Sequence, residues 1–231
     1  MNNMTTFLNK PVSFVDEQVW TVLPDSFSAP YDNKARLYEW LVKKHWYNKF
    51  FWGTSPCDYR QFAAKSIFHG KGNLLDIGCG GLVHTAAIYS KIKRNAFLLD
   101  NSTEMLKRGC RRVTNGRINN NLFFLQANAF DMPFANNSFD SVVSFGTIHL
   151  FEDKEKFVNE ALRVLKIGGD FHFSTMVTER PFSKKYLSAL HKRKEVGKPF
   201  SVDETLALFN GKVNAVNYTL KGSMMFIKGV K

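Results

Sequence analysis

The residues best placed to do chemistry lie at 74–82, where Leu-Leu-Asp-Ile-Gly-Cys-Gly-Gly-Leu joins an apolar run to a glycine turn. Such a turn lets bare backbone and a helix N-terminus approach a ligand closely. We expect Asp76 to sit at the strand tip, where it can pair with a cationic or amino group. Asp100 closes another apolar run roughly 20 residues past the glycines, where dinucleotide-binding folds place a ribose-binding acid. The spacing indicates a nucleoside or nucleotide site.

Strands and helices must alternate to hold these acids at one edge of a sheet. Short apolar runs predict strands at 73–77, 96–99, 122–125, 141–145 and 171–176. Helical spacing and start signals predict helices at 82–91, 101–112 and 154–165, the last ended by the glycine pair at 168–169. Such alternation favours a parallel sheet with helices on both faces.

The two ends of the chain have different patterns. An aromatic-rich stretch at 35–52 predicts an amphipathic helix. Ser201 and Glu204 form a capping-box signal for a late helix, and 213–220 with 224–230 predict a hairpin.

Four ordered segments resemble the motifs of the class I S-adenosylmethionine-dependent methyltransferases, especially the small-molecule branch with the quinone-biosynthesis enzymes. The segments are Leu75-Asp-Ile-Gly-Cys-Gly80, 97–102, 128–134 with 137–144, and 160–169. The resemblance implies an α/β fold with a Rossmann-like, seven-stranded, mostly parallel sheet whose last strand is antiparallel. It also implies S-adenosylmethionine as cofactor and methyl transfer to an O, N or C atom of a small acceptor, apolar or acidic.

The resemblance assigns roles residue by residue. The methionine end of the cofactor would lie near Asp76, Gly78, Cys79 and Gly80, and the ribose would bond Asp100. The adenine would lie among Asn101, Met105, Asn128 and Ala129, with Ser144 and Phe145 under the sulfonium and Tyr31 near the cofactor. His149 follows the fourth strand and could act as a general base, because an ordinary imidazole has a pKa near 6.5; an orienting role is the alternative. No metal is implied.

Three positions depart from the family pattern. Leu82 stands where a glycine is usual, and we expect it to crowd or shift the methionine end. Asn128 replaces an aspartate, so its amide accepts a bond from adenine without a charge, and we expect weaker binding. Ile167 replaces a proline, which should alter only a turn.

The predicted domain organisation is one methyltransferase domain over 1–231. Its parts are an N-terminal helical lid at 1–72, a cofactor-binding core at 73–176, a substrate-cap insertion at 177–212 and a C-terminal hairpin at 213–231. No apolar run suits a membrane span, the N-terminus does not resemble a signal peptide, and three widely spaced cysteines favour a reducing compartment. We therefore expect a cytoplasmic protein, and the sequence leaves its oligomeric state open.

Other functions remain open. A nicotinamide-dinucleotide fingerprint requires glycine at 83, where this chain has Val83. The net charge of +12 makes an RNA or tRNA methyltransferase the main rival, although no Asn-Pro-Pro-Tyr base-flipping motif is present. A non-catalytic S-adenosylmethionine-binding protein is the other rival.

Overall fold

The computed structural model describes residues 8–15, 18–24, 27, 29, 46, 49, 52–114 and 121–231. Its strands are β1 Ser13–Phe14, β2 Val19–Thr21, β3 Leu74–Ile77, β4 Ala96–Asp100, β5 Leu122–Gln126, β6 Phe139–Phe145, β7 Leu165–Met176, β8 Ala215–Lys221 and β9 Met224–Val230. Its helices are α3 Pro56–Phe68, α4 Ala86–Tyr89, α5 Thr103–Thr114, α6 Lys154–Val164, α7 Pro181–Lys192 and α8 Val202–Ala207, with a 3-10 turn at Ile148–Leu150.

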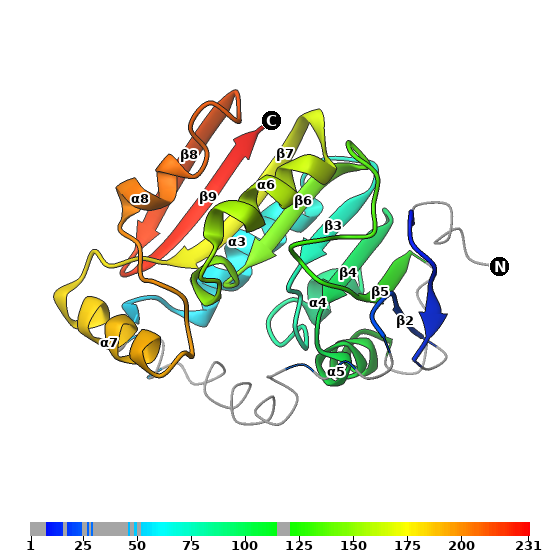
Figure 1. Cartoon of the computed structure of the whole chain (residues 1–231), viewed down its shortest axis with the longest axis horizontal. Coiled ribbons are helices and arrows are strands. Elements are labelled where there is room, and N and C mark those ends of the chain that lie inside the picture. The colour runs from blue at the N-terminus through cyan, green and yellow to red at the C-terminus, as the bar shows by residue number, and fades with distance from the viewer. Residues whose placement is uncertain are drawn as a thin grey trace.

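All these strands join one sheet in the order β1-β2-β5-β4-β3-β6-β7-β9-β8 (Figure 1). Neighbouring strands from β2 to β7 run parallel, whereas β1 is antiparallel to β2 and β9 runs antiparallel between β7 and β8. The chain builds outward from β3 through β4 to β5, then returns to place β6 on the other side of β3. Ligands of open α/β sheets bind at the carboxyl ends of the strands where the order reverses, so β3 and β6 mark the expected site.

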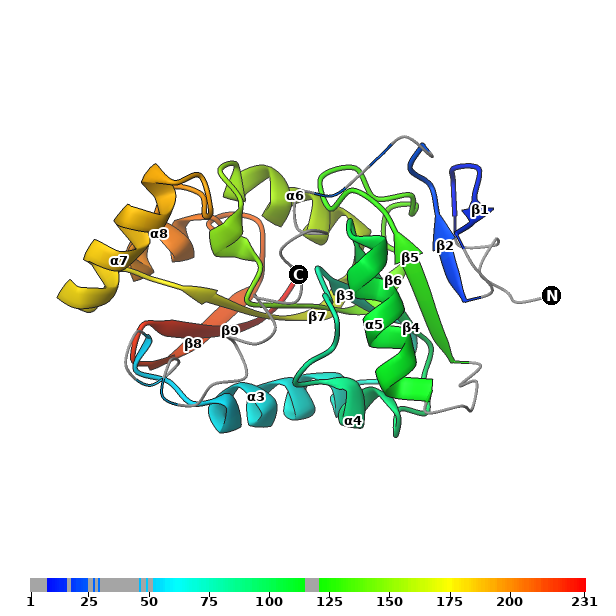
Figure 2. The ribbon, with the colours of Figure 1, turned by 90° about the horizontal axis from the view of Figure 1, so that it is seen from below.

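Helices cover both faces of the sheet, as Figure 2 shows with α3 and α4 on one side and α6 and α8 on the other. The alternation of side chains along β3 explains both layers. Leu75 and Ile77 join the cluster packed under α6, whereas Leu74 joins the cluster under α3, α4 and α5. The α/β fold with a mostly parallel sheet and an antiparallel late strand is confirmed.

The sheet has nine strands among the described residues instead of the predicted seven. The two additional strands, β1 and β2, come from the N-terminal segment, where a helical lid was predicted. Val19 and Trp20 of β2 pair in parallel with Phe124 and Leu125 of β5 and so extend the edge of the sheet. A strand of three residues is too short to give a periodic signal. Most of the predicted 35–52 helix lies outside the described residues.

Two predicted elements change their extent, and one helix was not predicted. The helix expected at 82–91 contracts to α4, because turns occupy most of residues 79–85. The glycine pair at 168–169 lies inside β7, since α6 already ends at Val164. The structure also contains α3, which was not predicted because Gly53 and Pro56 indicated a break. The capping box at Ser201 and the hairpin β8–β9 are confirmed.

None of the helices in the described ranges combines the length and the apolar run needed to cross a lipid bilayer.

Candidate active site

A cavity of about 290 Å³ opens at the carboxyl ends of the parallel strands, at the switch point between β3 and β6. Most of the residues predicted for the site line it: Gly78, Cys79, Gly80, Asp100, Asn101, Met105, Asn128, Ala129, Phe145 and His149. Asp76 and Ser144 are buried behind the wall and do not line it. Tyr31 lies outside the described residues.

The glycine turn after β3 is held against β4 by its own backbone. The N–H groups of Gly78 and Cys79 both donate to the carbonyl of Leu99, at 2.7 and 3.0 Å. Gly78 has φ +72°, and a Cβ there would approach Thr147 Cγ2 to 2.6 Å, so the turn fits closely under the loop after β6. Gly80 has φ +55°, and a Cβ on it would meet no atom of the described residues within 4 Å. The turn therefore presents open backbone to the cavity.

Asp100 places a fixed carboxylate beside this turn. Its Oδ2 accepts the N–H of Gly80 at 2.8 Å and its Oδ1 accepts the N–H of Ser102 at 2.9 Å. Ser102 also caps α5, because its Oγ accepts the N–H of Met105 at 3.2 Å. The helix predicted from residue 101 thus begins at Thr103, after the Ser102 cap.

Asp76 has a different place from the one predicted. It is the third residue of the four-residue strand β3, so its side chain shares the face of Leu74, which α3, α4 and α5 cover, instead of extending from the tip. There Oδ2 accepts the hydroxyl of Tyr89 at 2.6 Å, and Oδ1 is buried with no hydrogen-bond partner in the described part of the chain. Burial raises the pKa of Asp76 to about 7, with the charge of Asp100 adding to the rise and the Tyr89 hydrogen bond opposing it. A direct contact with the methionine end stays a prediction.

Ser144 and Cys79 both form hydrogen bonds within the protein. Ser144 is fully buried and donates its hydroxyl to the carbonyl of Ile77 at 2.8 Å, which ties β6 to β3. Burial, with the charges of Asp100 and Asp76 adding to it, raises the pKa of the Cys79 thiol well above its usual value. The raised pKa argues against a nucleophilic thiolate, and the bond that holds Cys79 in the turn is the one from its backbone N–H to Leu99.

The loop after β5 carries Asn128 and Ala129, the residues predicted for the adenine. Asn128 is exposed, and its Oδ1 accepts the N–H of Phe130 at 2.9 Å. An amide oxygen has two lone pairs, so this bond leaves one acceptor position for a ligand.

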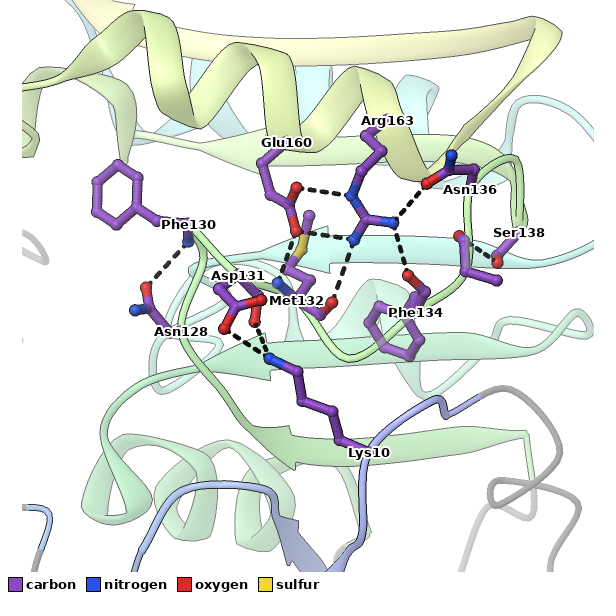
Figure 3. A network of polar contacts seen from close by, with 11 residues as sticks. Lys10, Asn128, Phe130, Asp131, Met132, Phe134, Asn136, Ser138, Glu160 and Arg163 are labelled. Atoms are coloured by element: carbon purple, nitrogen blue, oxygen red, sulfur yellow. Dashed lines mark hydrogen bonds and ion pairs between the residues drawn. The ribbon is translucent and has the colours of Figure 1, made fainter.

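Arg163 of α6 holds the rest of that loop in place (Figure 3). Its guanidinium donates to the carbonyls of Met132 and Phe134 at 3.1 and 2.7 Å and forms a two-pronged ion pair with Glu160. Glu160 in turn accepts the N–H of Met132 at 2.6 Å. These bonds fix the backbone that presents Asn128.

Packing explains why Leu82 departs from the family pattern. It adopts φ +54°, the left-handed conformation that a glycine ordinarily takes, and its side chain is only 1% exposed. A Cβ on Gly109 of α5 would meet Leu82 Cγ at 3.1 Å, so the glycine in the helix makes the room that the leucine fills. The leucine lines the cavity wall from the core side, where it packs against α5.

His149 lies in the 3-10 turn after β6 and is 8% exposed. Burial, together with the nearby charge of Lys154, lowers its pKa to about 3. Its Nδ1 is buried, and none of the described residues forms a hydrogen bond with it. The imidazole is therefore neutral near neutral pH, a state suited to accepting or donating one hydrogen bond; the general-base role stays a prediction.

Tyr59 lines the cavity from α3 and was not predicted from the sequence. Its hydroxyl donates to the carbonyl of Phe145 at 2.9 Å, which joins α3 to the end of β6. A signal for this helix was present, because Ser55 and Asp58 form a complete capping box with Pro56 in the first turn.

The donors and acceptors of the cavity fit S-adenosylmethionine. The Asp100 carboxylate suits ribose hydroxyls, and the open backbone at Gly80 leaves room beside it. The amide oxygen of Asn128 keeps one acceptor position, which suits an amino group such as that of adenine. Leu99, Met105 and Ala127 add apolar lining of the kind that suits a purine ring.

Comparison with known proteins agrees with this geometry. Residues 75–173 match the family model described as a methyltransferase domain. The chain is 37% identical over 116 residues to the ubiquinone/menaquinone biosynthesis C-methyltransferase UbiE of Blochmanniella floridana, covering 48% of this chain and 45% of that protein. It is 28% identical over 158 residues to an uncharacterized chloroplastic methyltransferase of Arabidopsis thaliana, covering 65% of this chain and 44% of that protein. The chain thus spans under half the length of these curated relatives.

Solved structures share the fold. The YcgJ protein of Bacillus subtilis superposes with a TM-score of 0.64 at 20% identity, covering 76% of this chain and 98% of that one. The putative methyltransferase crystallised with the Trm112 activator from Haloferax volcanii gives 0.67 at 18% identity, covering 89% and 99%. The family match, the ordered motifs and the strand order together support a class I S-adenosylmethionine-dependent methyltransferase domain in this chain, over the matched residues 75–173.

Proposed function

We propose that this protein transfers a methyl group from S-adenosylmethionine to a small, largely apolar acceptor. The observation that carries the proposal is the composition of the cavity. The lining includes the Asp100 carboxylate and the glycine backbone, which form its polar end. It also includes a connected group of apolar side chains, here called the apolar end, namely Phe130, Leu150, Phe151, Met176 and Met224. A charged, hydrogen-bonding cofactor and an apolar acceptor suit these two ends.

The segment 177–212 supports this assignment as a substrate cap. A small cluster of buried residues that includes Leu187 and Val196 packs against Leu150 and Met176, two residues of the apolar end. The cap is thus joined to the side chains that would contact the acceptor, and it would exclude water from the site.

A backbone contact ties the same segment to His149. The N–H of Gly197 donates to the carbonyl of His149 at 3.1 Å. A Cβ on Gly197 would approach the carbonyl oxygen of Phe151 to 1.9 Å, so the segment lies directly against the turn that follows β6. The position of the cap and the position of the imidazole therefore depend on each other.

The chain's own residues contribute mainly position. S-adenosylmethionine supplies an already activated methyl group, so alignment of the two reactants provides much of the rate. Asp100 and the glycine turn would fix the cofactor, and the apolar end would align the acceptor. The neutral imidazole of His149 would orient an acceptor hydroxyl through a hydrogen bond.

A hydroquinone-type acceptor is the first to test, because several similar curated proteins carry names of quinone- and hydroquinone-methylating enzymes. Purified protein is incubated with methyl-labelled S-adenosylmethionine and a panel of prenylated hydroquinones, phenols and small carboxylic acids. The proposal expects label in an apolar aromatic acceptor and little in the acids. Turnover confined to the acids would contradict the apolar assignment.

The net charge of +12 keeps nucleic acid as the alternative acceptor. The same assay with unmodified tRNA, run at low and at physiological salt, addresses it. Label in tRNA that persists at physiological salt would favour the tRNA alternative, because purely electrostatic binding weakens steeply as salt rises. Cofactor binding without turnover on any acceptor would favour a non-catalytic role.

A further inference from the structure

We propose that His69, Asp170 and His172 form a binding site for a divalent transition metal such as Zn²⁺, separate from the cofactor cavity. One ligand atom from each side chain lies within 4.8 Å of the other two. Imidazole and carboxylate together suit Zn²⁺ and its first-row neighbours. The described residues contain no other such group of three.

The fold brings the three side chains together from two elements. Asp170 and His172 are two residues apart on β7, so they share one face of the sheet. The third ligand, His69, is the C-cap of α3, and its ring centroid lies 5.7 Å from that of His172. The end of the helix therefore lies directly over the strand that carries the other two ligands.

Two of the three proposed ligand atoms already lie at the separation that they would have around a metal ion. His172 Nε2 and Asp170 Oδ2 lie 3.0 Å apart and share a hydrogen bond that a metal ion would replace. Ligand bonds of about 2.0–2.2 Å place ligand atoms roughly 3–4 Å apart around one ion. His69 is exposed, so its side chain has room to rotate toward the other two ligands.

A second layer of hydrogen bonds orients the carboxylate. Ser141 donates its hydroxyl to Asp170 Oδ1 at 3.0 Å, and Arg94 donates to that same Ser141 oxygen at 3.0 Å. Arg94 also donates to the carbonyl of Ile67 at 3.1 Å, near the end of α3. Arg94 therefore links α3 to Ser141 of β6, and Ser141 in turn holds the Asp170 carboxylate on β7, as outer partners do in metal sites.

The site opens into a second cavity of about 400 Å³, lined in part by His69, His172 and three lysines, Lys65, Lys221 and Lys228. The lysines are exposed, so water and salt screen their charges from a bound ion. Three protein ligands leave coordination positions open to water or an anion. An anion held by the lysines alone is the competing interpretation.

The proposed site is distant from the cofactor cavity. Pro56, the first residue of α3, lines the cofactor cavity, and His69 follows the last residue of that helix. At 1.5 Å per residue, the two ends are about 20 Å apart. A bound metal would clamp the far end of α3 to β7 and stabilise the folded chain.

The test is calorimetric titration of the tag-free chain with Zn²⁺ alone, beside the His69→Gln variant. His191→Gln is the matched control, because it removes a partly exposed histidine outside the cluster. We expect one equivalent of Zn²⁺ per wild-type chain, at least a tenfold weaker affinity in His69→Gln, and no change in the control. The rise in melting temperature that Zn²⁺ causes should likewise be smaller in His69→Gln than in wild type and in His191→Gln.

The thiols of Cys57, Cys79 and Cys110 are not joined in disulfides, so they are rival ligands for Zn²⁺. Replacing Zn²⁺ with Co²⁺ distinguishes them from the proposed ligands by the absorption spectrum. Absorption typical of nitrogen and oxygen ligands would support the site, and thiolate charge-transfer bands would overturn it. No Zn²⁺ binding by folded wild type, or equal binding by His69→Gln, would also overturn it. So would binding of inorganic phosphate by a chain that binds no Zn²⁺.

Discussion

The backbone N–H of Gly80 donates to the carboxylate of Asp100 at 2.8 Å, which joins the turn after β3 to the tip of β4. The two residues are 20 positions apart in the chain. Their contact places open backbone and a fixed negative charge side by side at the switch point of the sheet.

Asp100→Asn should weaken cofactor binding at least tenfold. The variant keeps the shape of the side chain but loses the charge, and one of the N–H groups of Gly80 and Ser102 loses its acceptor. Hydrogen bonds to charged groups are worth about 1.5–3 kcal/mol, and a tenfold change corresponds to about 1.4 kcal/mol. Calorimetry with S-adenosylhomocysteine measures the change. Asp203→Asn on α8 controls for net charge, and equal affinities for wild type and Asp100→Asn would contradict the prediction.

Gly80→Ala should bind the cofactor more weakly than a variant with the same loss of folding stability elsewhere in the chain. Its Cβ would enter open space at the cavity, at φ +55°. Gly168→Ala is the matched control, because that glycine has φ +76°, no described atom within 4 Å of its Cβ, and no place in the cavity lining. Both variants should lose about 1–2 kcal/mol of unfolding free energy from the left-handed backbone. An equal loss of affinity in both would show that the turn does not contact the cofactor.

Asp76 and His149 should drive stability in opposite directions as pH changes. From about pH 4 to 7 the folded chain holds a proton on Asp76 that the unfolded chain has lost, so stability falls as pH rises. From about pH 3 to 6.5 the unfolded chain holds a proton on His149 that the folded chain lacks, so stability rises with pH. Each effect is at most about 1.4 kcal/mol per pH unit, and the two oppose each other where they overlap.

Single variants should separate these two effects. Relative to wild type, Asp76→Asn should gain stability as pH rises from about 4 to 7, and His149→Asn should lose stability as pH rises from about 3 to 6.5. Urea unfolding at a series of pH values measures both slopes. Parallel curves for the three proteins would show that neither group has a shifted pKa.

Arg163→Lys should loosen the loop that carries Asn128. A lysine cannot reproduce the fork that reaches Glu160, Met132 and Phe134. We therefore expect a loss of about 1–3 kcal/mol of unfolding free energy, which urea unfolding measures.

Arg108→Lys on α5 is the control for this loop variant. Its arginine pairs with Glu104 at i,i+4 spacing on the helix surface, an interaction worth about 0.2–0.5 kcal/mol. Similar losses of stability in the Arg163 and Arg108 variants would contradict the role of the network.

The sequence predicted the central strands and most of the cavity wall because both depend on short-range patterns. The glycine turn, Asp100 and the loop at Asn128 follow strands with clear apolar runs, and parallel strands bring their carboxyl ends to one edge. The position of Asp76 was predicted less well, because its side chain lies against Tyr89 of α4 and not at the tip of the strand. It depends on where β3 ends, and a shift of one residue moves a side chain from the tip to a covered face.

Other features could not be predicted from the sequence because they depend on tertiary packing. Leu82 takes a glycine conformation only because Gly109, in α5, leaves room for its side chain. Strand β2 forms because β5 offers it an edge. Tyr59 was missed although the capping box at Ser55 marks its helix, since a proline at position 56 also suits a helix break.

Calorimetric titration of the folded wild-type chain with S-adenosylmethionine and with S-adenosylhomocysteine tests the central claim most directly. We predict saturable binding of both, one molecule per chain. Absence of binding heat from both ligands, on protein shown to be folded, would contradict the assignment of the cavity.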